Sequence, residues 1–299
     1  MEEAATGLFG YVENATLQNI CIEGGSITTN RNAGGIVGKA INSTILTCTN
    51  DGCNVTTPKR YTGGIVGFSE GSITIRDCAN TSATSITSGL NSGGIIGYTA
   101  VASTTILIDS CRNQGTIMGE SAAGGIVGSS YGNSSNTTIT IQYCRNAGPV
   151  SAEVNVGGII GYSAISVAGG TTIKYCSNGS AITANAVTSD DGDVAGIAGN
   201  IVSSFSITRC INSGTILSNG YDAAGILGAV NGTGGAGSGT ISYCYNSGSI
   251  TSNLTRAGGI LALGSSQATV TISRGVNTGT IETKAASSKC RRNILCHDI

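Results

Sequence analysis

Apolar and polar positions alternate along the chain within a short phrase that begins with cysteine. The phrase reads CRNQGTI at 111–117, CRNAGPV at 144–150, CINSGTI at 210–216 and CYNSGSI at 244–250. Its cysteine, asparagine, glycine and aliphatic residue occupy every second position, which is the side-chain period of a β-strand. The phrase therefore predicts an extended segment that sends these four side chains to one face, and we expect that face to be the inside of the fold.

A second apolar phrase alternates with the first. It opens as TGLFG at 6–10, reads GGIVG at 34–38, 63–67 and 124–128, and recurs in altered form until GGILA at 258–262, which makes nine copies. The closing glycines of successive copies are 28 to 38 residues apart, a spacing typical of solenoids. One unit holds too few apolar residues to close a core alone, so neighbouring units must stack.

We therefore predict an all-β fold, a parallel β-solenoid or β-helix of about nine coils with about three short strands in each coil. Residues 1–283 form this tandem repeat domain, and residues 284–299 form an irregular C-terminal tail in which the pattern is lost. With coils stacked at the ~4.8 Å spacing of neighbouring strands, the rod is roughly 40 Å long.

Stacking of such coils predicts two interior columns, a structural core ladder. The cysteine column holds Cys48, Cys78, Cys111, Cys144, Cys176, Cys210 and Cys244. The asparagine column holds Asn50, Asn80, Asn113, Asn146, Asn178, Asn212, Asn246 and Asn277. We expect the thiols to be free and buried, because a stack places Cβ atoms about 4.8 Å apart and a disulfide needs about 3.8 Å. The asparagine amides can bond to one another along the stack or to turn backbone.

The GGIVG phrase leaves one ambiguity, because it has two adjacent apolar residues where strict alternation would send one outwards. Either the flanking glycines let both side chains point inwards, or an apolar stripe runs along the rod as a contact surface. We favour burial of both.

Composition narrows the classes of partner. The chain carries a formal net charge of −1 and only 10% charged residues, so we expect no nucleic-acid partner and no electrostatic binding to a membrane. No apolar stretch is long enough to span a bilayer.

The first ten residues lack a secretory signal and already lie in the repeat, so we expect the sequence to be a fragment. In the tail, Cys290 and Cys296 are placed to close a small loop under oxidising conditions.

The copies of TGLFG and GGIVG resemble the GLUG-motif repeat family, which comprises glycine-rich tandem repeats of bacterial surface and adhesin-like proteins and of some secreted IgA-directed metallopeptidases. The resemblance covers about residues 1–283. It implies an extracellular or bacterial cell-surface location and a passive repeat region. The zinc peptidase segment has no counterpart, because an HExxH site needs two histidines and this sequence has one, His297.

Two groups of carboxylates are candidate sites. Asp190, Asp191 and Asp193 surround Gly192, and such a cluster suits calcium, although Asp-Gly sequences are also common as simple turns. Asp77 and Asp109 lie one and two residues before cysteines of adjacent coils. A carboxylate pair on neighbouring coils is what polysaccharide cleavage would need, and solvated corner residues are the alternative interpretation.

Loops of variable length are the candidate ligand-binding surface. They include Tyr131, Asn133, Asn136, Asn231 and Thr233, and a rigid rod that carries such loops is suited to recognition. We therefore predict a non-enzymatic adhesive stalk or spacer for a host or environmental glycan or protein, with no cofactor other than calcium. The alternatives are a carbohydrate-active β-helix enzyme of the polysaccharide lyase or hydrolase type, and a filament subunit that self-associates end to end or laterally.

Overall fold

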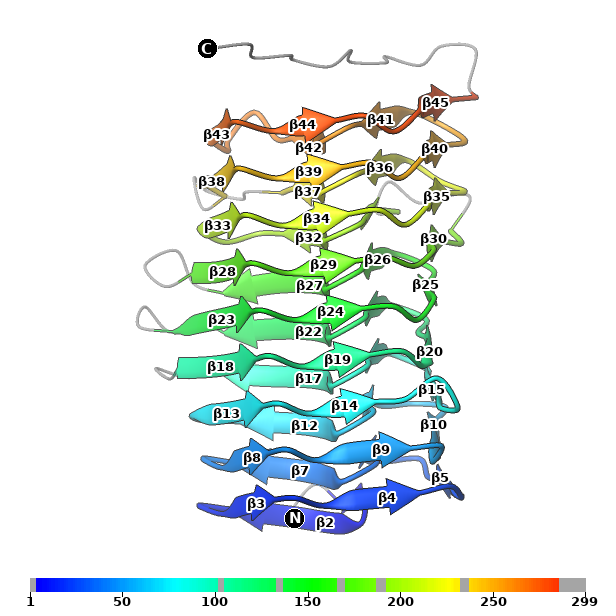
Figure 1. Cartoon of the computed structure of the whole chain (residues 1–299), viewed down its shortest axis with the longest axis vertical. Coiled ribbons are helices and arrows are strands. Elements are labelled where there is room, and N and C mark those ends of the chain that lie inside the picture. Colours follow the sequence, from blue (N-terminus) through cyan, green and yellow to red (C-terminus); the bar gives the residue numbers. More distant parts are fainter. Residues whose placement is uncertain are drawn as a thin grey trace.

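The computed structural model describes residues 4–101, 105–132, 137–165, 170–186, 192–231 and 237–284. These residues form nine stacked coils of five short strands each, and every strand pairs in parallel with its equivalent in the next coil (Figure 1). The predicted fold class, an all-β parallel β-solenoid, is confirmed. Its strands are more finely divided than expected, because bends break each coil into five segments and so produce five sheets.

The strands of each sheet follow one another from coil 1 to coil 9. The first sheet contains β1 (Ala5–Thr6), β6 (Asn32–Gly34), β11 (Thr62–Gly63), β16 (Asn91–Gly93), β21 (Ala122–Gly124), β26 (Asn155–Gly157), β31 (Val194–Ala195), β36 (Asp222–Ala224) and β41 (Arg256–Gly258). The second contains β2 (Phe9–Glu13), β7 (Val37–Ile41), β12 (Val66–Glu70), β17 (Ile96–Val101), β22 (Val127–Gly132), β27 (Ile160–Ile165), β32 (Ala198–Ile201), β37 (Leu227–Val230) and β42 (Leu261–Gly264).

The remaining three sheets complete each coil. The third contains β3 (Thr16–Gln18), β8 (Thr44–Leu46), β13 (Ile73–Arg76), β18 (Thr105–Asp109), β23 (Thr138–Gln142), β28 (Gly170–Lys174), β33 (Phe205–Thr208), β38 (Gly239–Ser242) and β43 (Val270–Ser273). The fourth contains β4 (Cys21–Glu23), β9 (Thr49–Asp51), β14 (Ala79–Asn80), β19 (Arg112–Asn113), β24 (Arg145–Asn146), β29 (Ser177–Asn178), β34 (Ile211–Asn212), β39 (Tyr245–Asn246) and β44 (Val276–Asn277). The fifth contains β5 (Ser26–Thr28), β10 (Asn54–Thr57), β15 (Ser85–Ser88), β20 (Thr116–Met118), β25 (Val150–Ala152), β30 (Ile182–Ala184), β35 (Ile216–Ser218), β40 (Ile250–Ser252) and β45 (Ile281–Thr283).

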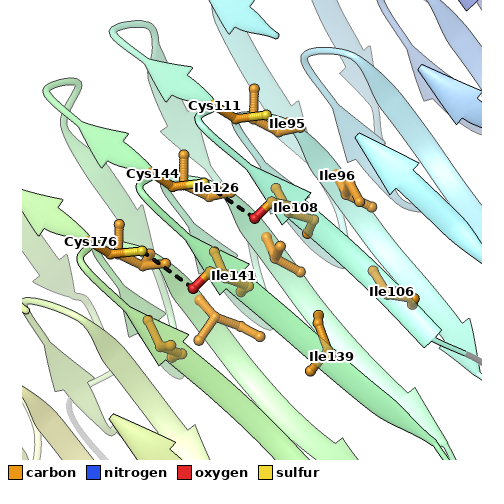
Figure 2. Packing of buried hydrophobic residues seen from close by; sticks show 14 of the residues in the cluster. Ile95, Ile96, Ile106, Ile108, Cys111, Ile126, Ile139, Ile141, Cys144 and Cys176 are labelled. Carbon is orange, nitrogen blue, oxygen red and sulfur yellow. Dashed lines mark hydrogen bonds between the residues drawn. The ribbon is translucent and has the colours of Figure 1, made fainter. Parts of the chain in front are cut away.

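The interior is filled by columns of like residues, because the register sets equivalent positions directly above one another. Ile108 pairs with Ile141 in the third sheet, for example, and Ile141 pairs with Ile173. The inward isoleucines pack with the second-sheet aliphatics and the cysteines into one continuous apolar cluster along the rod (Figure 2). A second cluster of smaller residues lies between the first and fifth sheets.

Both apolar residues of the GGIVG phrase are buried. Ile126 and Val127 are fully covered in coil 5, and the equivalent pairs in coils 2–8 are covered in the same way. The first sheet ends at the first glycine and the second sheet begins at the second aliphatic residue, so the chain bends between them and strict alternation is interrupted. The expected burial is therefore confirmed in coils 2–8, where this phrase forms no apolar stripe, whereas Leu8 and Phe9 of the terminal coil 1 are exposed.

An uninterrupted ladder of asparagine amides runs through coils 3–9. The Nδ2 atom of Asn113 donates to the Oδ1 atom of Asn146 at 2.8 Å, and Asn146 donates in turn to Asn178 at 2.8 Å. The same bond joins each successive pair from Asn80 to Asn277. The second hydrogen of the Asn146 amide is donated to the carbonyl oxygen of Gly148 at 2.9 Å. Both donors of the buried amide are therefore satisfied inside the rod.

The ladder does not extend to the first coils. Asn50 donates to the carbonyl oxygens of Cys53 and Gly64 rather than to Asn80, and its Oδ1 atom accepts the Cys53 N–H. In coil 1 the register places Ile22 at the asparagine position. Side chains of this terminal coil, Ile22 among them, are only partly buried, because one neighbouring coil covers them instead of two.

The asparagine ladder also explains the second glycine of the GGIVG phrase. A Cβ atom on Gly125 would lie 2.4 Å from Cγ of Asn146 and 2.2 Å from the carbonyl oxygen of Gly158. Equivalent glycines meet the asparagine of their own coil from Gly35 to Gly259. No side chain fits at such distances, so the two repeated phrases depend on each other: the amide of one fills the space that the glycine of the other leaves.

Removing one amide from the middle of the ladder should destabilise the rod. In Asn146→Ala, the Asn113 amide loses its acceptor, and the Gly148 carbonyl and Asn178 Oδ1 lose a donor, so we expect a loss of about 3 kcal/mol in the free energy of unfolding. Asn277→Ala, at the half-buried end of the ladder, should cost about 1 kcal/mol. Urea unfolding followed by circular dichroism measures both, and equal losses would contradict a ladder that depends on burial.

Candidate functional site

The seven cysteines of the predicted column lie inside the rod with free thiols. Each sulfur faces two carbonyl oxygens. Cys144 Sγ, for example, lies 3.2 Å from the oxygen of Gln142 and 3.7 Å from that of Ile108, and Figure 2 shows Cys144 and Cys176 with their bonds to the preceding coil. Burial raises the pKa of the Cys144 thiol. The burial of all seven thiols is typical of a packed core, in which cysteine acts as a small apolar residue.

The off-column cysteines are distributed differently. Cys53 is buried and its thiol is free, whereas Cys21 is exposed and free. Cys290 and Cys296, with the loop that they were expected to close, lie outside the described residues.

The strand register does not set the two aspartates that we considered as a catalytic pair directly opposite each other, although the backbone N–H of Asp77 donates to the carbonyl oxygen of Asp109 at 3.1 Å. Asp109 pairs with Arg76 rather than with Asp77. The Nε atom of Arg76 lies 3.2 Å from Asp109 Oδ2, and Ser110 Oγ donates to Asp109 Oδ1 at 3.0 Å. Asp77 is exposed at the following corner. Asp109 is thus part of an ion pair between coils.

Only some residues of the predicted loop and calcium sites are described. Tyr131 lies near the end of β22 and is exposed, and Asn231 follows β37. Asn133, Asn136, Thr233, Asp190 and Asp191 lie outside the described residues. In the described part of the chain, no three His, Cys, Asp or Glu side chains gather as metal ligands would, so the calcium site stays a prediction.

The structure brings two of these predicted residues, Asp193 and Asn231, into one polar cluster. Asn200 Nδ2 donates to Asp193 Oδ2 at 2.7 Å, and Asn231 Nδ2 lies 3.5 Å from the same oxygen. The register sets Asp193 of coil 7 beside Asp222 of coil 8. We call Asp193, Asp222, Asn200, Asn231 and Arg256 the aspartate cluster.

Arg256 of coil 9 completes the aspartate cluster. Its Nη2 atom donates to Asp222 Oδ2 at 2.9 Å, and its Nε atom donates to Asp222 Oδ1, so the interaction is bidentate. Asp222 is fully buried, whereas Arg256 reaches solvent. Burial raises the pKa of Asp222, and the bond and charge of Arg256 offset this increase only in part. The raised pKa of Asp222 makes its ionisation, and with it the contact between coils 8 and 9, sensitive to pH.

A sequence signal for the aspartate cluster exists, although sequence reasoning missed it. Asp193, Asp222 and Arg256 all stand two residues before the GGIVG phrase or its variant. In the structure this position is a column of the first sheet. Aligning the copies by the position two residues before each phrase would have placed the two aspartates and the arginine on consecutive coils.

No protein family, curated protein or solved structure matches the chain. Across the described residues there is no helix with the length and hydropathy that crossing a membrane requires. The function therefore has to be inferred from the geometry of the rod and its surfaces.

The aspartate cluster predicts how stability changes with pH. The pKa of Asp222 is raised in the folded protein, so protonation of this carboxyl group stabilises the fold. This contribution to the free energy of unfolding is complete below the unfolded carboxyl pKa of about 3.9, and it is lost as the pH rises through the folded-state pKa. Asp222→Asn removes this titration. Urea midpoints measured from pH 3 to 8 should fall less steeply for Asp222→Asn than for the native protein. Asp51→Asn, which removes one exposed carboxyl group, should follow the native curve; identical slopes for all three proteins would refute the assignment.

Cysteine burial predicts a selective alkylation pattern. When the folded protein is treated with iodoacetamide and digested, mass spectrometry should find Cys21 labelled and the seven column cysteines unlabelled. After unfolding in urea, all eight should react. Labelling of Cys144 in the folded state at the rate of Cys21 would contradict the buried column.

Proposed function

We propose that the chain is a non-enzymatic repeat protein of the extracellular space or the bacterial cell surface, which acts as an adhesive stalk or spacer. The observation that carries this proposal is the unbroken parallel register of five sheets over nine coils. Continuous sheets and a filled core make a stiff rod, since each coil is held by backbone bonds at five places. The resemblance of the repeats to the GLUG-motif family supports the location.

The corners of the rod differ in a way that suits display. Connections between the second and third sheets range from two residues, between β7 and β8, to eight residues, between β37 and β38. Connections between the third and fourth sheets have two residues in every coil. Connections between the fifth and first sheets also vary, from two residues, between β15 and β16, to nine residues, between β30 and β31. Loop length can therefore change at these two corners without disturbing the register. We infer that the corner between the second and third sheets, which we call the variable corner, presents its loops to a glycan or protein ligand.

A glycan and host-matrix array tests the proposal. We expect specific binding of the purified protein without turnover of the bound polysaccharide. Binding should fall in a variant in which residues 231–238 are replaced by Asn-Ser, the two residues that join β7 to β8. Tyr131→Ala, at the exposed end of β22, is the point-mutant counterpart.

The matched control shortens no loop. Thr49→Ala changes a half-buried strand residue of the fourth sheet, away from the variable corner, and should bind like the native protein. Polysaccharide turnover that is lost in Asp77→Ala or Asp109→Ala would make the chain an enzyme and reject the stalk. Absence of any binding, with the fold intact by circular dichroism, would also reject the adhesive role.

A further inference from the structure

The corner between the third and fourth sheets has an unusual backbone. In every coil the residue before the cysteine position has a positive φ and is not glycine: Asn19, Thr47, Asp77, Ser110, Tyr143, Tyr175, Arg209, Tyr243 and Arg274, with φ between 50° and 57°. This left-handed conformation is unfavourable for residues with a Cβ atom and is best tolerated by glycine and asparagine. The corner itself therefore favours small residues.

From coil 5 onwards the sequence departs from that preference. Coils 1–4 place asparagine, threonine, aspartate and serine at the corner, but coils 5–9 place only tyrosine and arginine there. A strained conformation that large side chains occupy in five consecutive coils points to a role for those side chains outside the core. We call Tyr143, Tyr175, Arg209, Tyr243 and Arg274 the tyrosine–arginine ladder.

The members of the ladder are stacked along the rod, on the corner that lies between β23 and β24 in Figure 1. The rings of Tyr143 and Tyr175 are nearly parallel, with centroids 4.9 Å apart. Arg209 lies 5.5 Å from the Tyr175 ring and 5.5 Å from the Tyr243 ring, and Arg274 lies 4.8 Å from Tyr243. The Arg274 guanidinium also donates to the Tyr243 hydroxyl. These contacts hold the guanidinium groups in place beside exposed rings.

The stack determines which parts of the side chains a ligand meets. Tyr143, Tyr175 and Tyr243 are 54%, 41% and 47% exposed. Both faces of Tyr175 and Tyr243 are covered by neighbours in the ladder, so these two rings offer only their edges and hydroxyls, beside the guanidinium groups, for binding. Nucleic-acid bases need free ring faces for stacking. The ladder instead offers hydrogen-bond donors and positive charge in a row.

The surface around the ladder is basic. Arg145 and Lys174 lie within two residues of it in the sequence, and Arg145 is exposed. From two residues before to three residues after the cysteine position, coils 5–9 contain four cationic residues and no acidic one. The described acidic residues of these coils lie elsewhere: Glu153, Asp193 and Asp222 near the first sheet, and Glu282 in β45.

We propose that the tyrosine–arginine ladder binds a linear polysaccharide that carries carboxylate groups, a uronic-acid polymer, laid along the rod. The planar fork of a guanidinium matches a carboxylate with two parallel bonds, and tyrosine hydroxyls can bond sugar hydroxyls between such contacts. Because the corner has two residues in every coil, the binding groups repeat at the coil rise of about 4.8 Å, which suits an extended polymer. This inference rests on the proposed adhesive function and names one class of ligand for it.

The test compares polygalacturonate with its fully methyl-esterified form, which has the same backbone without the charge. Biolayer interferometry with the full chain should show saturable binding to polygalacturonate, weakened by salt, and no binding to the ester. Arg209→Gln/Arg274→Gln should weaken binding roughly tenfold. Arg31→Gln/Lys59→Gln removes the same charge from exposed positions between the fifth and first sheets and should bind like the native protein.

A second variant separates binding from folding. Tyr143→Asn places at the corner a residue that tolerates the left-handed conformation, so its melting temperature should equal or exceed the native value while its affinity for polygalacturonate falls. Equal affinities of Arg209→Gln/Arg274→Gln and of the Arg31→Gln/Lys59→Gln control for polygalacturonate would overturn the proposal. Tighter binding to dextran sulfate or to a thymidine oligonucleotide than to polygalacturonate would also overturn it. If the array shows binding to a neutral glycan or a protein but polygalacturonate does not bind, only the proposal for the tyrosine–arginine ladder is rejected. If neither experiment shows binding, the proposed adhesive function is rejected as well.

Discussion

The buried asparagine column sets the geometry of this rod. An apolar interior alone does not define how far one coil is displaced relative to the next, because isoleucine side chains pack acceptably in several positions. A buried amide is less tolerant, since displacement by one residue would leave its donors and acceptor without partners. The bond from Asn113 to Asn146, repeated along the stack, therefore favours one register. The ladder also requires the second glycine of each GGIVG phrase, because only glycine leaves room there for the asparagine amide.

Much of this architecture could be predicted from the sequence because it repeats. The period-2 positions of CRNQGTI predict an inward face, and the repetition of that face predicts stacking, so Cys144 and Asn146 could be placed in columns before any coordinates were known. The subdivision into five sheets could not be predicted, since it depends on bends such as that at Gly35 and Ile36, where glycine removes the alternation on which the reasoning relied.

The surface sites were harder to predict for a different physical reason. Interior positions are constrained in every coil and therefore look alike, whereas a surface residue has only to avoid disturbing its neighbours. A shift of one residue in the strand register changes the partner of Asp109. The sequence pattern suggested Asp77 as that partner, whereas the strands pair Asp109 with Arg76. The bond between Asp222 and Arg256 uses the position two residues before the GGIVG phrase, which holds different residue types from coil to coil and so does not look like a motif. Tyr143 and Tyr175 could not be assigned to the tyrosine–arginine ladder from the sequence, because that assignment depends on the left-handed backbone at their corner.

The end of the ladder at Asn50 shows that the stack can change its side-chain bonds without losing contact between coils. In a stack where each coil contacts only its neighbours, cooperativity is carried by the interfaces. Between coils 2 and 3 the backbone pairing continues, and Asn50 of coil 2 donates to the Gly64 carbonyl oxygen of coil 3 in place of Asn80. This bond ends on a backbone oxygen, so it does not need an asparagine side chain as its acceptor. The chain of amides can therefore stop at this interface while the coupling between coils continues toward the amino-terminal coil.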